Sequence, residues 1–226
     1  MLIGFITLTN NGYLEYTRNC IKSLEQIGVE GLKVYCIDDK AYDNLDYSRK
    51  LKIDNTEDEE VEDFYTFRSG GQWTKIVYQK FRIIHRELLK NDFVLFTDGD
   101  IVFKDKRFLK DLINRIDDND LLIQNDKQDD NDDSELCTGF QFIKSNKKTI
   151  DFYNPERMKL EDMGECDQIY VNANKNKLQY ERLPLKKYPN GKYYQDNKND
   201  SYIIHYNYLI GHDKKSMMIK DNHWFL

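Results

Sequence analysis

Two apolar strands separated by one helix fill the first 37 residues, and this order constrains the fold more than any other feature. The apolar run 2–8 ends in the polar segment 9–12, which predicts a buried strand and a turn. Residues 13–27 follow with the apolar spacing of one helical face, and a second strand is predicted at 32–37. The apolar positions of the helix are Leu14, Ile21, Leu24 and Ile27. A strand–helix–strand unit of this length predicts parallel pairing through a right-handed crossover.

Strands and helices continue to alternate along the chain. Helices are predicted at 73–89, 107–116, 166–173 and 214–220, and strands at 93–96, 101–103, 121–124, 139–143 and 202–205. No linker rich in Pro, Gly or Ser and no internal repeat divides the sequence. We therefore expect one α/β domain over residues 1–226, with a single Rossmann-like, mixed and mainly parallel sheet flanked by helices.

Composition excludes several classes of protein. The 34 basic and 40 acidic residues give a net charge of −6, which argues against a nucleic-acid partner bound through a basic surface. No apolar stretch approaches the ~20 residues that span a bilayer. The N-terminus lacks the basic region and cleavage site of a signal peptide, and the four cysteines form no C-x-x-C pair. These features favour a soluble, cytoplasmic protein with reduced thiols.

Acidic residues cluster strongly in two places and form three D-x-D triplets. Seven of the ten residues at 54–63 are acidic, as are six of the ten at 126–135, and both runs are typical of solvated loops. The triplets at 118–120 and 130–132 are expected to face solvent. Only Asp98-Gly99-Asp100 ends an apolar strand, at the strand edge where open α/β sheets bind ligands. Two carboxylates on a short turn suit Mg²⁺ or Mn²⁺ as ligands. The alternative is that this triplet is only a turn between two strands and binds no metal.

Two further segments contain candidate functional residues. His205 ends a late apolar strand and is either a buried, hydrogen-bonded histidine or a third metal ligand. Lys214 or Lys215 is either solvated or holds a phosphate. Asp167 and Gln168 open a predicted helix, where the aspartate either caps the helix or, with the amide, faces the hydroxyls of a sugar.

Taken in order, these motifs resemble the retaining GT-A glycosyltransferases of the glycogenin and galactosyltransferase type and the related nucleotide-diphospho-sugar transferases. The similar segments are residues 6–13, Lys80, Phe96-Thr97-Asp98-Gly99-Asp100, Thr138-Gly139-Phe140, Asp167-Gln168 with Asn172, and His205 followed by Gly211 and a lysine. The resemblance covers nearly the whole chain. The sequence departs from the family in a longer gap between His205 and Lys214 and in lacking a Pro-Trp after that lysine, so the choice between Lys214 and Lys215 stays open.

The resemblance implies an enzyme that moves a sugar from a nucleotide-diphosphate donor, with UDP favoured, to a glycan or glycoprotein acceptor with retention. It implies that Mn²⁺ or Mg²⁺ is held by Asp98, Asp100 and His205, and that Asp167 and Gln168 are the catalytic residues that orient the sugar. The implied donor-binding residues are Leu8, Thr9, Asn10, Tyr13, Lys80, Asp98, Gly99, Thr138, Gly139, Gly211, Lys214 and Lys215. Residues 1–100 would form the nucleotide half and residues 101–226 the sugar and acceptor half.

Other functions fit the sequence less well. A haloacid-dehalogenase-type phosphatase places its paired aspartates near the start of the chain, before any complete βαβ unit. A nucleotidyltransferase that forms sugar nucleotides needs an early loop containing arginine, and this sequence has no such loop. A dinucleotide-binding dehydrogenase needs a G-x-G motif, which is also missing. The non-enzymatic alternative is a catalytically inactive module that binds a sugar nucleotide.

Overall fold

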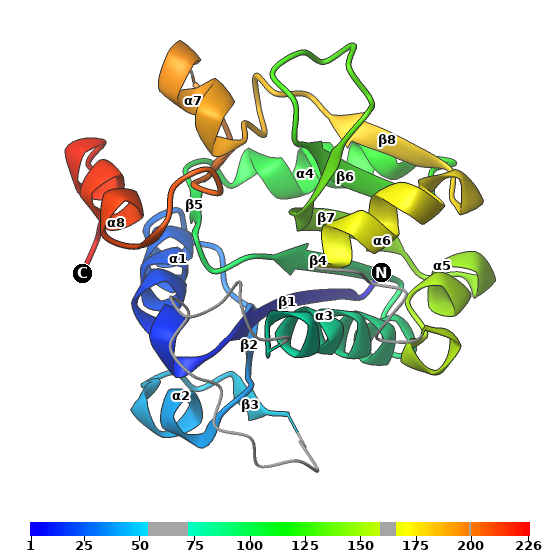
Figure 1. The fold of residues 1–226 in the computed structure, drawn as a ribbon, viewed down its shortest axis with the longest axis horizontal. Coiled ribbons are helices and arrows are strands. Elements are labelled where there is room, and N and C mark those ends of the chain that lie inside the picture. Colours follow the sequence, from blue (N-terminus) through cyan, green and yellow to red (C-terminus); the bar gives the residue numbers. More distant parts are fainter. Residues whose placement is uncertain (54–71, 159–165, 199) are drawn as a thin grey trace.

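The computed structural model describes residues 1–53, 72–158, 166–198 and 200–226, with the side chains of 72–77 left aside (Figure 1). The acidic run 54–63 lies outside these residues. The second acidic run is exposed at 129–134, as expected, but its ends at Asp126 and Glu135 are partly buried. Among the described residues, no helix combines the length and apolar character needed to cross a membrane.

The strands and helices follow the predicted alternation. The strands are β1 (Ile3–Thr9), β2 (Lys33–Cys36), β3 (Lys50–Lys52), β4 (Phe93–Thr97), β5 (Ile101–Phe103), β6 (Leu121–Asn125), β7 (Leu136–Lys144), β8 (Tyr180–Leu183) and β9 (Ile203–His205). The helices are α1 (Leu14–Gln26), α2 (Asp39–Asn44), α3 (Gln72–Leu88), α4 (Arg107–Ile116), α5 (Lys147–Phe152), α6 (Asp167–Asn174), α7 (Gly191–Asn197) and α8 (Gly211–Lys220), with short 3-10 turns at Asn11–Tyr13, Pro155–Arg157 and Lys175–Lys177.

The described strands form one seven-stranded sheet and one pair. The large sheet has the order β3-β2-β1-β4-β7-β6-β8. Neighbouring strands of this sheet run parallel, except that β7 runs antiparallel to both of its neighbours, β4 and β6. This arrangement confirms the predicted mixed, mainly parallel sheet, in which the first βαβ unit contributes the parallel neighbours β1 and β2. Because β1 and β4 are parallel neighbours, the loops after both strands leave the same edge of the sheet.

Helices cover both faces of the sheet (Figure 1). Alternate residues of the central strands point to opposite faces, so Phe5 packs on one core and Ile6 on the other. The Phe5 core includes α1 and α4, whereas the Ile6 core includes α3, α5 and α6. Both residues are almost fully buried, as expected for strands covered on both sides.

A small second sheet brings two distant parts of the chain together. Strand β5 pairs with β9 in antiparallel register, with Ile101 opposite His205. The Tyr206 amide also donates to the carbonyl of Asp100 at 3.3 Å. Phe103 is tied to helix α1, because its amide donates to Ser23 Oγ at 3.0 Å. The pairing therefore places His205 beside Asp100, although 105 positions separate them in the numbering.

One prediction about the acidic triplets is wrong. Asp120 does not face solvent, because it is only 5% exposed. Its carboxylate accepts hydrogen bonds from the Gln179 amide at 2.9 Å and from Asn146 Nδ2 at 2.8 Å. Asp120 thus joins the start of β6 to the segments before β8 and α5, which is a structural role that a triplet pattern does not reveal.

Candidate active site

The turn after β4 brings its two carboxylates to the end of the sheet. The Asp98 amide donates to the carbonyl of Gly139 at 2.7 Å, which ties the turn to β7. Gly99 lies so close to helix α1 that an added Cβ would sit 2.6 Å from Thr17 Oγ1. A glycine is therefore needed here for close approach, and its presence between the two aspartates has a steric reason.

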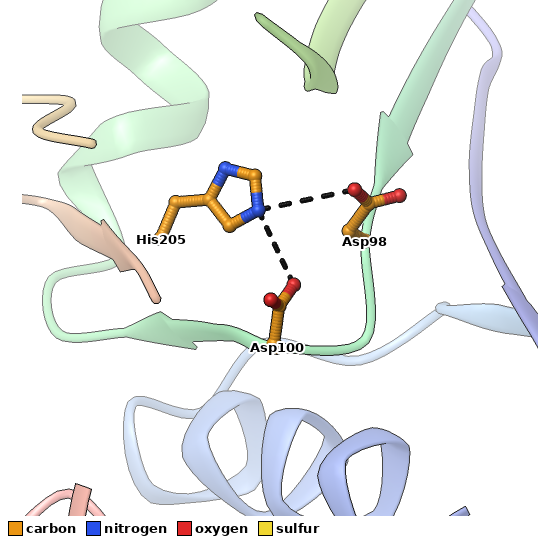
Figure 2. Close-up of side chains that lie close together, drawn as sticks. All are labelled: Asp98, Asp100 and His205. Atoms are coloured by element: carbon orange, nitrogen blue, oxygen red, sulfur yellow. Dashed lines mark ion pairs between the residues drawn. The ribbon is translucent and has the colours of Figure 1, made fainter. Parts of the chain in front are cut away.

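Asp98, Asp100 and His205 converge as the sequence predicts (Figure 2). His205 Nε2 lies 3.2 Å from Asp100 Oδ1 and 3.8 Å from Asp98 Oδ2. One potential ligand atom from each residue lies within 4.8 Å of the other two. The side chains of Asp100 and His205 are buried, while that of Asp98 is 33% exposed. The group is thus open to a ligand on the Asp98 side.

The donor set fits a divalent cation. Asp100 Oδ1 is buried and has no hydrogen-bond partner among the described residues. An orphaned carboxylate oxygen that faces an imidazole nitrogen is costly, unless a proton or a cation lies between the two. Two carboxylates and one imidazole offer the oxygen and nitrogen atoms that Mn²⁺ accepts, and they leave positions for the oxygens of a substrate.

Lys80 connects the predicted metal residues to the predicted sugar residues. It reaches from α3 to Asp167 Oδ2 at 2.7 Å and to Asp98 Oδ1 at 3.3 Å. Burial alone would lower the pKa of Lys80, but the charges of Asp167 and Asp98 outweigh it and raise that pKa above its usual value. Lys80 therefore stays positively charged between Asp98 and Asp167.

Lys214 supplies a second positive charge, from α8. Its Nζ lies 2.5 Å from Asp100 Oδ2 and 3.0 Å from the Tyr13 hydroxyl. Burial alone would raise the pKa of Asp100, but the charge of Lys214 holds that pKa well below its usual range. Lys215 points elsewhere and pairs with Glu15 at 2.8 Å. The structure thus separates two adjacent lysines that the sequence pattern left equivalent.

Asp98 has the opposite electrostatic balance. Burial raises the pKa of Asp98 above its usual value, and the neighbouring charge of Asp100 adds to that effect. The charge of Lys80 opposes it without overcoming it. Three carboxylates, those of Asp98, Asp100 and Asp167, lie beside only two lysines, Lys80 and Lys214, and this excess of negative charge favours a cation.

Gly139 forms the wall of the site. A Cβ at this position would lie 2.2 Å from His205 Cε1 and 2.6 Å from Asp98 Oδ2. The carbonyl of the preceding Thr138 accepts from Lys80 Nζ at 3.5 Å. The predicted donor-binding residues Thr138 and Gly139 thus lie against the metal residues. Only glycine at position 139 leaves room for the imidazole of His205.

Asp167 and Gln168 lie on the first turn of α6 with different partners. Asp167 is 4% exposed and faces Lys80, so it is not simply a helix cap. Gln168 Nε2 donates to Asp126 Oδ2 at 2.8 Å and to Glu135 Oε1 at 3.3 Å. Burial raises the pKa of Asp126 above its usual value. The described structure therefore brings the two ends of the acidic run 126–135 to the predicted catalytic amide.

The predicted nucleotide loop follows β1 beside this site. The Asn10 side chain accepts from the Tyr13 amide at 3.0 Å and caps the 3-10 turn. Thr9 Oγ1 accepts from Thr17 Oγ1 at 2.8 Å, whereas Leu8 is partly exposed. Gly211, at φ +55°, begins α8, and its carbonyl accepts from the Tyr16 hydroxyl at 2.8 Å. The loop and α8 therefore flank the turn that carries Asp98 and Asp100.

A comparison with protein families identifies the relatives of this site. A model of the nucleotide-diphospho-sugar transferases matches residues 28–218, which is most of the chain. The chain belongs to this family. Membership confirms the resemblance to the nucleotide-diphospho-sugar transferases recognised in the sequence.

Individual relatives agree with the family. The UDP-galactose:fucoside alpha-3-galactosyltransferase of Dictyostelium discoideum is 28% identical over 284 aligned residues, covering 98% of this chain and 43% of the relative. The chain thus spans less than half the length of this relative. Among solved structures, the galactosyltransferase LgtC, with donor and acceptor sugar analogues, has a TM-score of 0.55 at 16% identity, covering 91% of this chain and 86% of LgtC.

A second solved structure supports the same fold. A glycosyltransferase involved in glycosylation of the major capsid of PBCV-1 has a TM-score of 0.63 at 13% identity, covering 97% of this chain and 100% of its own. At these identities the structural likeness establishes the GT-A fold of the family, as predicted, and says nothing about individual substrates.

Sequence reasoning missed two residues that the structure places at the site. Asp126 was hidden inside an acidic run, where nothing local separates it from its solvated neighbours. Gln124 ends an apolar strand and contacts His205, and its amide belongs to no recognisable motif. The one signal that pointed toward them was position, because Gln124 lies near the end of buried strand β6 and Asp126 directly follows that strand.

Proposed function

We propose that this chain is a metal-dependent glycosyltransferase that takes a sugar from a nucleotide-diphosphate donor. The observation that carries the proposal is the convergence of Asp98, Asp100 and His205, with Lys214 2.5 Å from Asp100. A carboxylate–imidazole group beside a lysine matches the leaving group of such a reaction, which is an anionic diphosphate. Family membership supports the same class of substrate.

Asp98, Asp100 and His205 would hold the cation, and Mn²⁺ or Mg²⁺ suits these ligands. When bound, the ion would offset the negative charge that builds on the departing diphosphate. Lys214 would move from Asp100 toward that diphosphate, since its ammonium group can pair with either anion. Leu8, Thr9, Asn10, Tyr13, Gly99 and Gly211 surround the position proposed for the nucleotide.

The sugar would lie against Asp167, Gln168, Thr138 and Gly139. Lys80 fixes the Asp167 carboxylate at 2.7 Å, so that its other oxygen is positioned for a sugar hydroxyl. We propose transfer with retention by front-side attack. The bond from the sugar to the phosphate oxygen breaks while the acceptor oxygen bonds to the same carbon, and the acceptor proton passes to the departing phosphate.

UDP-galactose is the first donor to test, and a fucoside is the first acceptor. Both appear in the name of the Dictyostelium relative, whose sequence covers this chain almost completely. We also propose that residues 1–100 bind mainly the nucleotide and that residues 101–226 bind the sugar and a glycan or glycoprotein acceptor. The first part contains the loop after β1 and the second contains α6.

A panel of nucleotide sugars tests this function. The protein is incubated with each donor and Mn²⁺, with and without acceptor, and nucleotide release is measured before and after chelation. We expect release from at least one donor that stops with EDTA and returns with added Mn²⁺. Full activity after exhaustive chelation would contradict the metal dependence. Stabilisation by UDP and Mn²⁺ without release from any donor would indicate an inactive binding module instead.

A further inference from the structure

The Gln124 side chain is locked in one orientation at the end of β6. It is completely buried. Its Nε2 donates to two backbone carbonyls, those of Tyr188 at 3.1 Å and Pro189 at 2.9 Å. Both amide hydrogens therefore have acceptors, and reversing the amide would place its oxygen against two carbonyl oxygens. The network thus determines which end of the amide is the oxygen.

That oxygen faces His205. Gln124 Oε1 lies 2.7 Å from His205 Nδ1, with both side chains buried. Since an amide oxygen only accepts, this hydrogen bond requires a proton on Nδ1. A neutral imidazole carries only one proton, so Nε2 then holds a lone pair. Nε2 is the nitrogen that points toward Asp98 and Asp100.

Other neighbours of Nδ1 do not replace this acceptor. Cys137 Sγ lies 3.6 Å away, and thiol sulfur is a weak acceptor. Asn207 Nδ2 donates to the same sulfur at 3.7 Å. Gln124 is therefore the strong partner of Nδ1 among the described residues.

The sheet is irregular where this contact forms. Strand β6 pairs Ile123 with Gln141 but pairs the next residue, Gln124, with Cys137. The three intervening residues of β7, 138–140, thus leave the ladder with β6, although Phe140 still pairs with Thr97 of β4, and they include the predicted donor-binding residues Thr138 and Gly139. A bulge of this kind re-aims side chains next to functional sites. Here Gly139 lies against the imidazole of His205, whose Nδ1 faces the amide of Gln124.

We infer that Gln124 is a positioning residue, which holds His205 in the Nδ1–H tautomer and so presents a bare Nε2 to a cation between Asp98 and Asp100. Metal-binding histidines commonly donate their second ring N–H to such a partner, which orients the ring and raises its basicity. The inference rests on the proposed function for its catalytic consequence. The protonation of Nδ1 and the affinity for metal are independent of any sugar transfer.

The first test needs no substitution. Nitrogen-15 NMR of the metal-free protein reports which ring nitrogen of each histidine carries a proton, and a His205→Gln variant assigns one of the four histidine signals. We expect a protonated Nδ1 in His205, hydrogen-bonded and slow to exchange. A bare Nδ1 with the proton on Nε2 would overturn the inference, whether or not the protein transfers sugar.

The second test measures Mn²⁺ binding to variants by electron paramagnetic resonance. Gln124→Leu removes the acceptor and is expected to weaken Mn²⁺ binding about 10- to 100-fold, as for other partners of metal-bound histidines. Gln124→Glu keeps an acceptor for Nδ1–H but turns its second oxygen toward the carbonyls of Tyr188 and Pro189, so its affinity should lie between those of the wild type and Gln124→Leu. Gln141→Leu is the matched control, because Gln141 is also a buried glutamine of the sheet but bonds to Tyr153 and Thr138.

The pattern across these variants separates positioning from folding. A structural role alone predicts equal losses of metal affinity in the two leucine variants, and that result would overturn the inference. Unchanged affinity in folded Gln124→Leu would do the same. If Gln124→Leu does not fold, the NMR result and the Gln124→Glu affinity still decide. If instead no donor sugar is ever cleaved but Nδ1 is protonated and the affinities follow the predicted order, the proposed function fails and the positioning role stands.

Discussion

Buried carboxylates lie at both ends of the central strands, and their surroundings differ. At the starting ends of β1 and β2, Glu87 is 2% exposed, and both of its oxygens are hydrogen-bonded. Lys33 Nζ lies at 2.6 Å, the Tyr35 hydroxyl at 2.8 Å and Asn91 Nδ2 at 3.2 Å. At the opposite end, Asp100 Oδ1 has no hydrogen-bond partner among the described residues.

The pKa values of Glu87 and Asp100 are both lowered, so the contrast in pKa direction is between Glu87 and Asp98. Burial alone would raise the pKa of Glu87, but Lys33, Tyr35 and Asn91 outweigh it and lower that pKa below its usual value. Burial raises the pKa of Asp98, and the charge of Lys80 does not compensate. A carboxylate whose partners come entirely from the protein stabilises the fold. A group of carboxylates left short of positive charge is prepared for a ligand.

Asp98→Asn should sharpen this contrast most. The substitution removes one charge from a site with excess negative charge, so turnover should fall by about 10²–10³-fold, as for other losses of electrostatic stabilisation of a transition state. The melting temperature should stay the same or rise, because one of several neighbouring carboxylates is neutralised. Nucleotide release and thermal unfolding measure the two effects. A strongly destabilised variant would show that Asp98 is as structural as Glu87.

Gly139→Ala should come next in size. The new methyl group would lie 2.2 Å from His205 Cε1, so the imidazole must move away from the carboxylates. We expect Mn²⁺ affinity and turnover to fall together by about 10- to 100-fold, the loss typical of a disturbed metal-ligand environment. Electron paramagnetic resonance and nucleotide release are the measurements. Retained metal affinity would mean that Gly139 is needed only for the backbone and not to leave space for the imidazole of His205.

Lys214→Met and Lys215→Met form a matched pair on one helix. A hydrogen bond to a charged group contributes about 1.5–3 kcal/mol, so losing a lysine–diphosphate contact should lower kcat/KM by roughly 10- to 100-fold. The Lys215 variant should lose far less, because that lysine contacts Glu15. Steady-state kinetics with the best donor separate the two. Equal effects would indicate that α8 rearranges on binding and that the position of Lys214 beside Asp100 is not the relevant one.

Glu87→Gln should produce the reverse of the Asp98 result. Its network loses charge-assisted hydrogen bonds, and the free energy of unfolding should fall by about 1–3 kcal/mol. The kcat of the folded variant should remain near that of the wild type, since the cluster is at the far end of the sheet. Urea unfolding and steady-state kinetics check the two statements. A large loss of kcat without loss of stability would break the comparison.

The pH dependence of that difference is the smallest effect. A pKa lowered by folding means that the contribution of Glu87 is complete above its unfolded value of about 4.5 and is lost as the pH falls through the folded value. The difference in stability between wild type and Glu87→Gln should therefore begin to narrow as the pH falls below about 4.5, and it should close below the folded pKa. Unfolding curves at several acidic pH values would show this, and a constant gap would mean that the charge of Glu87 does not matter.

Periodic segments were predictable because local pattern and tertiary role agree. The helix at 107–116 and the strand at 101–103 have the predicted bounds, and α1 and β4 differ from prediction by a residue or two. Strand β8 was missed because it lies at an edge of the sheet and includes charged residues, Glu181 and Arg182, that mask its alternation. The short helices α2 and α7 contain too few turns to show a periodicity.

The site was predictable where a residue type is unusual in its place. Asp98 and Asp100 are conspicuous after an apolar strand, and His205 is conspicuous at the end of another. The choice of Lys214 over Lys215 was not predictable, because it depends on how α8 is rotated against Tyr13. Gln124 was not predictable either, since its role depends on a contact with a residue 81 positions away.

The most direct test of the account is a crystal of the protein soaked with UDP and Mn²⁺, with anomalous diffraction recorded near the manganese edge. We predict one strong anomalous peak enclosed by Asp98, Asp100 and His205 Nε2, next to the diphosphate, with Lys214 turned from Asp100 to a phosphate oxygen. A nucleotide bound without manganese at these three residues, or manganese bound at another place, would contradict the central claim.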